Sequence, residues 1–61
     1  MLPKIHRLRT VRQITSLSTS TLYAMMARGE FPRPLRLGKR AVGWREADLR
    51  DWLESREQAV S

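Results

Sequence analysis

The side chains best suited to recognise another molecule lie between Ser18 and Arg28, a segment expected to form a short helix. Its apolar stripe is Leu22, Met25 and Met26, so at about 100° per residue the opposite face carries small and hydroxyl-bearing residues. That face consists of Ser20, Ala24 and Ala27, flanked by Thr19 and Tyr23 on one side and by Arg28 on the other. Small side chains let a helix approach another surface closely, and the DNA major groove is wide enough to admit a helix. The pattern favours base readout by the hydroxyl-bearing residues, with packing of the alanines against another protein helix as the alternative.

The distribution of charge also favours a nucleic-acid partner. Residues 1–45 contain ten Lys or Arg and one acid, Glu30, a net +9, whereas residues 46–61 contain two Arg and five acids, a net −3; together they give the +6 of the 61-residue chain. A chain that needs only solubility would mix the two signs. Segregated positive charge around a helix pair is the electrostatic footprint of a nucleic-acid binder, and a generic basic surface is the alternative.

The composition argues against several other functions. The chain has no cysteine and a single histidine, His6, so neither a disulfide nor a cysteine metal site is expected. No converging nucleophile and base are visible, so we expect no enzyme, no cofactor and no small-molecule substrate. No apolar run approaches the roughly 20 residues of a membrane span, so we expect no membrane partner and a cytoplasmic, nucleoid-associated protein.

Two helices joined by a tight turn are expected to position the recognition face. Thr10 and Gln13 form a Thr-x-x-Gln capping box, which predicts a first helix from Thr10 to about Ser16. Ser18 is the N-cap expected for the second helix, and Gly29 is its expected C′ residue with positive φ. Such a pair is either a helical hairpin or a helix-turn-helix, and the charge distribution favours the second.

A short hairpin is expected to follow the helices. Residues 35–37 and 41–44 read as strands joined by the three-residue connection 38–40, which contains glycine. Alternation predicts that Leu35 and Leu37 share the core-facing side with the apolar residues of the second strand, leaving Arg36 outside. With Lys39 and Arg40 at its tip, the hairpin resembles a wing that contacts phosphates. Phe31, before the hairpin, is expected to plug the core beneath the second helix.

The rest of the chain completes the predicted architecture. Residues 46–57 read as a third helix with an acidic outer face, which DNA would repel, and Trp44 and Trp52 are expected at the centre of the core. The predicted fold is mostly α with a small β-hairpin: a winged helix-turn-helix with two short helices, a two-stranded wing and a C-terminal helix. Residues 1–9 are expected to be a basic arm, 10–57 the DNA-binding domain, and 58–61 a frayed C-terminus.

Several stretches together resemble the AlpA family of phage-type transcriptional regulators, which are small MerR-like winged helix-turn-helix proteins related to excisionases. The matching stretches are Leu17-Ser18, Ser20-Thr21-Leu22-Tyr23, Gly29 with Phe31-Pro32-Arg33-Pro34, Leu37-Gly38, Arg40-Ala41-Val42-Gly43-Trp44, and Trp52-Leu53 followed by Arg56. The family usually has Thr-Gly-Leu-Ser before the second helix, where this chain has Ser16 in place of the glycine, and commonly a basic residue where this chain has Thr19. The resemblance implies a bacterial or phage-encoded regulator of integration or excision genes, or a recombination directionality factor.

Three functions are compatible with the sequence. The leading hypothesis is a sequence-specific double-stranded DNA-binding transcriptional regulator, acting as a homodimer or by cooperative assembly on DNA. An excisionase-like architectural factor would use the same surface, and a protein-interaction adaptor with a basic face is a remoter alternative. The predicted DNA-binding residues are Arg12, Ser18, Thr19, Ser20, Tyr23, Arg28, Arg36, Lys39, Arg40 and Arg45. The operator, the sign of regulation and the oligomeric state remain open at this point.

Overall fold

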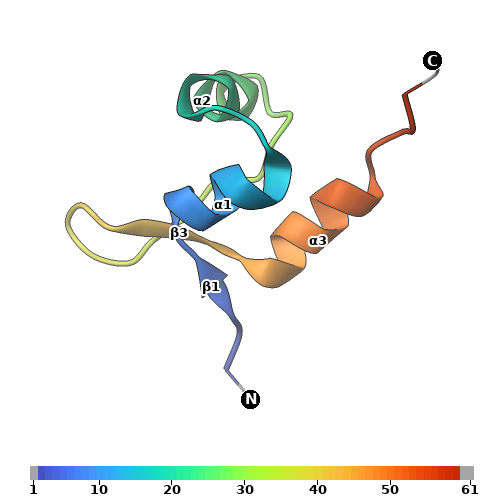
Figure 1. Cartoon of the computed structure of the whole chain (residues 1–61). Coiled ribbons are helices and arrows are strands. Elements are labelled where there is room, and N and C mark those ends of the chain that lie inside the picture. The colour runs from blue at the N-terminus through green and yellow to red at the C-terminus, as the bar shows by residue number, and fades with distance from the viewer. Residues whose placement is uncertain (1, 60–61) are drawn as a thin grey trace.

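The computed structural model describes residues 2–59 of the chain. In chain order the elements are β1 (Ile5–His6), α1 (Leu8–Thr15), α2 (Thr19–Ala27), β2 (Leu35–Arg36), β3 (Val42–Arg45) and α3 (Glu46–Glu54). The strands form an antiparallel sheet in the order β1-β3-β2, with α1 and α3 packed on β3 (Figure 1). The fold is a mostly helical winged helix-turn-helix, as predicted. Of the segment 58–61, which was expected to fray, residues 58–59 have no regular secondary structure and the rest lies outside the described residues.

The turn between α1 and α2 is held by side-chain hydrogen bonds. The Thr15 hydroxyl donates to the carbonyl of Val11 at 2.9 Å and accepts from the backbone N–H of Leu17 at 3.2 Å. Ser16 ends α1 in the left-handed conformation, with φ 60° and ψ 22°, and its N–H donates to the carbonyl of Arg12 at 2.8 Å. The structure therefore keeps, with a serine, the backbone conformation that glycine adopts without steric cost.

Replacing Ser16 by glycine is expected to stabilise the domain. A non-glycine residue in the left-handed region costs about 1 kcal/mol, while glycine recovers part of that energy and loses some through unfolded-chain entropy. Thermal unfolding followed by circular dichroism should show a rise of a few degrees for Ser16→Gly. A lower melting temperature than that of the natural chain would mean that Ser16 is held by a favourable contact that the turn geometry does not explain.

The first helix begins earlier than the capping box predicted. It starts at Leu8, with Arg7 in extended conformation as a cap residue that makes no side-chain capping bond, so Thr10 lies inside the first turn. The reason is the strand β1, which the sequence reading missed. Ile5 pairs with Arg45 of β3, and only one residue separates β1 from the helix. Tertiary pairing thus fixes the helix start more strongly than a local capping preference.

The ends of α2 match the prediction. The Ser18 hydroxyl accepts a hydrogen bond from the backbone N–H of Thr21 at 3.2 Å, which satisfies one of the free donors of the first turn. At the other end Gly29 follows the helix with φ 73°. These caps fix the length of α2 and therefore which residues lie on its exposed face.

The hairpin forms between β2 and β3, but its two faces are not those predicted. Leu35 pairs with Gly43, and Arg36 pairs with Val42. Directly paired residues of an antiparallel sheet place their side chains on the same face. Leu35 therefore shares the face of Gly43, while Arg36 shares the inner face with Val42, next to the helices. The prediction that the leucines face the core and Arg36 faces outward was wrong: the side chains of this strand lie on the opposite faces.

A close approach at Gly43 accounts for this register. A Cβ atom at position 43 would lie 2.6 Å from Ile5 Cγ2 and 2.9 Å from Leu37 Cδ1. Because glycine has no side chain, Ile5 and Leu37 close over the strand from either side. This leaves an apolar patch on the outer face of the sheet, where Leu37 is 47% exposed.

The core lies on the other face of the sheet, under the three helices. Its buried residues are Val11, Leu22, Met26, Phe31, Trp44 and Leu49. Phe31 is the plug that the sequence predicted, and its ring lies edge-on to the rings of Trp44, with centroids 6.4 Å apart, and of Trp52, at 4.8 Å. Trp44 is 1% exposed, as expected, but Trp52 is only half-buried because Phe31 occupies the centre between the two indoles.

Both tryptophans also hold the segment that leads from α2 to the wing. Trp44 Nε1 donates to the carbonyl of Pro32 at 2.8 Å, and Trp52 Nε1 donates to the carbonyl of Glu30 at 2.8 Å. These bonds satisfy carbonyl groups in a segment that has no regular secondary structure. They fix where the hairpin starts relative to α2.

Candidate nucleic-acid interface

The exposed face of α2 carries small and hydroxyl-bearing side chains. Ser20, Ala24 and Ala27 are exposed, Tyr23 is 47% exposed, and Thr19 is half-buried. Their spacing of three and four residues makes one continuous stripe along the helix. The stripe contains no acidic side chain, and Tyr23 is its one bulky residue, so the helix backbone can approach a partner surface closely on either side of that ring.

Ser18 has a different role from its neighbours. Besides accepting from the N–H of Thr21, its hydroxyl lies 2.9 Å from the Thr21 hydroxyl and 3.3 Å from that of Ser20. This network ties Ser18 to the cap and steadies the Ser20 hydroxyl at the start of the helix. The sequence prediction placed Ser18 among the contact residues, and in the structure it positions the helix end.

A groove separates α2 from the wing and has cationic walls. It is lined by Tyr23, Met26 and Ala27 of α2, Arg33 and Pro34 of the connecting segment, and Arg36 and Val42 of the hairpin. Arg36 Nη1 donates to the carbonyl of Lys39 at 3.1 Å, so the guanidinium also braces the wing turn. Two exposed arginines beside an exposed tyrosine form an arrangement that can bind the phosphates bordering a groove.

A second basic depression lies at the other end of α2, against α1. It is lined by Arg9, Arg12, Gln13, Ser16, Leu17 and Ser18. Arg9 and Arg12 are one helical turn apart, so both guanidinium groups extend from the same side of α1 toward the start of α2. The exposed stripe of α2 is therefore bordered by cations at both ends.

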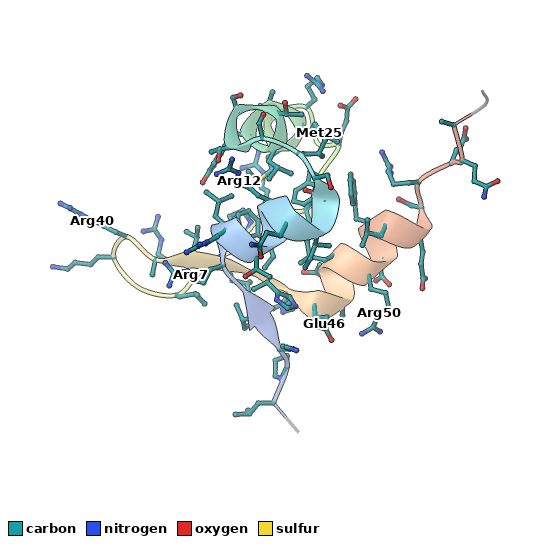
Figure 2. The ribbon with its side chains drawn as sticks, viewed as in Figure 1. Arg7, Arg12, Met25, Arg40, Glu46 and Arg50 are labelled. Carbon is teal, nitrogen blue, oxygen red and sulfur yellow. The ribbon has the colours of Figure 1, made fainter. Side chains whose placement is uncertain are left out.

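The wing tip adds cations beyond the groove. Lys39 and Arg40 are exposed in the turn between β2 and β3. This turn is closed by a hydrogen bond of 2.7 Å from the Leu37 N–H to the Ala41 carbonyl. Figure 2 shows Arg40 extending from this tip, on the side of the molecule where Arg7 and Arg12 also lie. The two cations lie at the tip as predicted, but the regular strands end at Arg36 and begin at Val42, so the connection between them has five residues and not three.

Two of the predicted contact residues line neither depression and lie next to acids of the same chain. Arg28, the residue that caps the C-terminal end of α2, forms an ion pair with Glu30, with 2.7 Å between Nε and Oε1. Arg45 is exposed, lies 3.7 Å from Asp48, and shares the outer face of the sheet with Ile5, with which it pairs. The structure thus brings Arg36 together with Tyr23, and Arg12 together with Ser18, but not Arg28 or Arg45.

Two arginines of the basic depressions were not predicted as individual contact residues, although phosphate contacts were expected from the arm that includes Arg9. Arg33 was read only as part of a proline-rich connection, although flanking prolines restrict the backbone and fix where such a side chain extends. Arg9 was assigned to an N-terminal arm, because the helix was expected to begin at Thr10. Its spacing of three residues from Arg12 was the available signal, since it matches one face of a helix.

The acidic helix α3 lies away from these cations. Figure 2 shows Glu46 and Arg50 on the side of the molecule opposite to Arg40. His6 Nε2 donates to Glu46 Oε1 at 3.0 Å, and this hydrogen bond, aided by the charges of Lys4 and Arg50, lowers the pKa of the Glu46 carboxyl. The pair joins β1 to the start of α3 and places negative charge away from the basic surface.

Within residues 2–59, no cluster of three or more His, Cys, Asp or Glu is arranged to hold a metal ion. None of the helices in this range is long and apolar enough to cross a membrane.

Comparison with known proteins identifies a family and a phage relative. The model of a family described as prophage CP4-57 regulatory protein (AlpA) matches residues 4–57, which is most of the chain. An uncharacterised protein of Enterobacteria phage P4, ORF88, is 34% identical over 50 residues, covering 82% of this chain and 57% of the relative. The chain therefore spans a little more than half the length of this relative.

Proposed function

Because the chain belongs to the AlpA family of prophage regulatory proteins, we propose that it regulates transcription by binding a specific sequence of double-stranded DNA. In this proposal α2 enters the major groove and the wing follows the neighbouring phosphate backbone. The observation that carries it is the exposed stripe of small and hydroxyl-bearing residues on α2, bordered at both ends by arginines.

The roles of the side chains follow from their positions. Ser20 lies at the exposed start of the stripe and Tyr23 at its middle; they are assigned to base edges and sugar-phosphate groups, with Thr19 assisting beside Ser20. The phosphate contacts are assigned to Arg9 and Arg12 on one side of α2, to Arg33 and Arg36 on the other, and to Lys39 and Arg40 at the wing tip. Phosphate contacts set position and affinity, while the few base contacts set sequence preference.

Selection of bound duplexes from a random pool tests the proposal. We expect enrichment of a short shared motif, with a protected length that shows how many copies bind. Affinity for the winning duplex should fall steeply as salt rises, since bound phosphates release counterions. A pool without enrichment, together with no salt-dependent binding to any duplex, would contradict the proposal and favour a protein-interaction adaptor.

Removal of both wing-tip cations should weaken binding to every duplex by the same factor, whatever its sequence. Lys39→Ala with Arg40→Ala removes two phosphate contacts, so the slope of log affinity against log salt should become shallower by about two. The matched control is Arg50→Ala with Arg56→Ala, which removes the same charge from α3 and its C-terminal end and should leave the slope nearly unchanged. Equal effects of the two double variants would show that only total charge matters and would remove the wing from the interface.

A further inference from the structure

The outer face of the sheet bears an apolar patch that the proposed DNA contacts do not use. Ile5 and Leu37 meet over Gly43, and Leu35 lies on the same face. We call these three apolar side chains the sheet patch. The groove toward DNA lies on the other face of the same strands, with Arg36 and Val42, so bound DNA does not cover the sheet patch.

A second apolar patch lies between α1 and α3. Ile14 of α1 is 40% exposed and Leu53 of α3 is 41% exposed, and both border a shallow pocket whose floor includes the buried Leu49. We call Ile14, Leu49 and Leu53 the helix patch. Exposed apolar residues clustered in this way, rimmed by charged groups, are typical of contact surfaces.

The two patches carry rims of opposite charge. The helix patch is bordered by Glu46, Glu54 and Arg50, and α3 as a whole is acidic. The sheet patch shares its face with Arg45 and adjoins the cationic wing tip. Two sheet patches facing one another would bring like charges together, as would two helix patches, whereas one of each kind is complementary.

We propose that the sheet patch of one copy docks against the helix patch of the next copy when both are bound at adjacent sites on DNA. This inference rests on the proposed function. The contact joins two different surfaces of the same chain, so it is head-to-tail and leaves one patch of each kind free at the ends of a row. Further copies extend the row along the duplex.

DNA is needed to make this contact effective. The sheet patch offers three apolar side chains and the helix patch only two exposed ones, Ile14 and Leu53, so their contact buries far less than the roughly 1,000 Å² or more expected of a stable interface. Free copies therefore stay apart. Neighbouring sites on one duplex raise the local concentration to the millimolar range, where a weak contact acts. The geometry therefore gives a chain that is monomeric in solution and cooperative on tandem sites.

The test uses the full chain with two duplexes, one carrying a single selected site and one carrying two adjacent sites in the same orientation. Leu37→Gln disrupts the sheet patch and Leu53→Gln disrupts the helix patch; neither residue belongs to the buried core, with 47% and 41% of their surfaces exposed, so the fold should survive. Each variant alone should bind the single site with normal affinity. On the two-site duplex its cooperativity factor, the gain in affinity for the second site once the first is filled, should fall about tenfold or more. The matched control is Ala47→Gln, an exposed position on α3 outside both patches, which should keep full cooperativity.

Mixing the two variants gives the sharpest result. Leu53→Gln still supplies a sheet patch and Leu37→Gln still supplies a helix patch, so an equal mixture should regain cooperativity on the two-site duplex. Glu54→Lys changes only the charge on the exposed rim of the helix patch, disturbs no packing, and should also lower cooperativity. Circular dichroism verifies the fold of each variant.

The outcomes separate this inference from the proposed function. If the natural chain does not bind the duplex with a single selected site, the proposed function is contradicted. Normal single-site binding without cooperativity, or cooperativity that either Leu37→Gln or Leu53→Gln keeps, would overturn the head-to-tail contact alone. Cooperativity that both single variants lose and their mixture fails to regain would overturn it as well.

Discussion

Replacing Trp44 by alanine is expected to unfold the domain under conditions in which the natural chain is folded. Trp44 is 1% exposed, lies edge-on to Phe31, and donates a hydrogen bond to the Pro32 carbonyl. Removing a buried aromatic residue costs about 3–5 kcal/mol, which for a chain of this size approaches its entire stability. The loss also frees the connecting segment that positions the wing.

Thermal unfolding followed by circular dichroism measures this effect. Each kcal/mol shifts the melting temperature of a small domain by about 4–8 °C, so Trp44→Ala should lose its cooperative transition or show it far lower. Trp52→Ala is the comparison, since that ring is half-buried and its loss should cost less. A Trp44→Ala variant that melts within a few degrees of the natural chain would contradict the core described above.

The second large effect concerns recognition rather than stability. Ser20→Ala with Tyr23→Ala removes two exposed groups from α2 and leaves Leu22 and Met26 in the core. Exposed substitutions usually change stability by less than about 0.5 kcal/mol, so the fold should persist. Affinity for the selected duplex should nevertheless fall by about 1–3 kcal/mol for each lost base contact.

Paired titrations on selected and scrambled duplexes check this result. Binding to scrambled DNA should fall less, because the arginines that contact phosphates remain. The matched control is Asp51→Ala with Ala47→Ser, two exposed changes on α3 that should alter neither affinity. If Ser20→Ala with Tyr23→Ala leaves both affinities unchanged, α2 does not read the DNA sequence. If that variant unfolds, the buried and exposed faces of α2 were assigned incorrectly.

Features governed by neighbouring residues could be predicted from the sequence. Ser18 caps α2, Gly29 ends it with positive φ, and the connection 38–40 closes the hairpin, because each depends on side-chain chemistry within a few residues. Phe31 was also placed in the core correctly. The exposed stripe of α2 followed from the same local argument, since helical periodicity alone separates its two faces.

Features governed by distant pairing could not be predicted in this way. The strand β1 exists only because Ile5 and His6 pair with β3, almost forty residues further along the chain. The faces of the hairpin depend on how Leu37 and Ile5 close over Gly43, and alternation within one strand does not show which partner residue is a glycine. Arg9 was misassigned for the same reason, because the start of α1 is set by β1.

Cleavage of DNA from a single labelled position tests the central claim most directly. The chain has no cysteine, so Ser20→Cys, Lys39→Cys and Asp51→Cys each offer one attachment site for an iron chelate that cuts nearby backbone. From position 20 we expect cuts within the selected motif, with the stagger between strands that marks the major groove, and from position 39 cuts at its flank. Position 51, on α3, should give none. Cuts from position 51 with none from position 20 would contradict the placement of α2 in the groove and of the wing on the backbone.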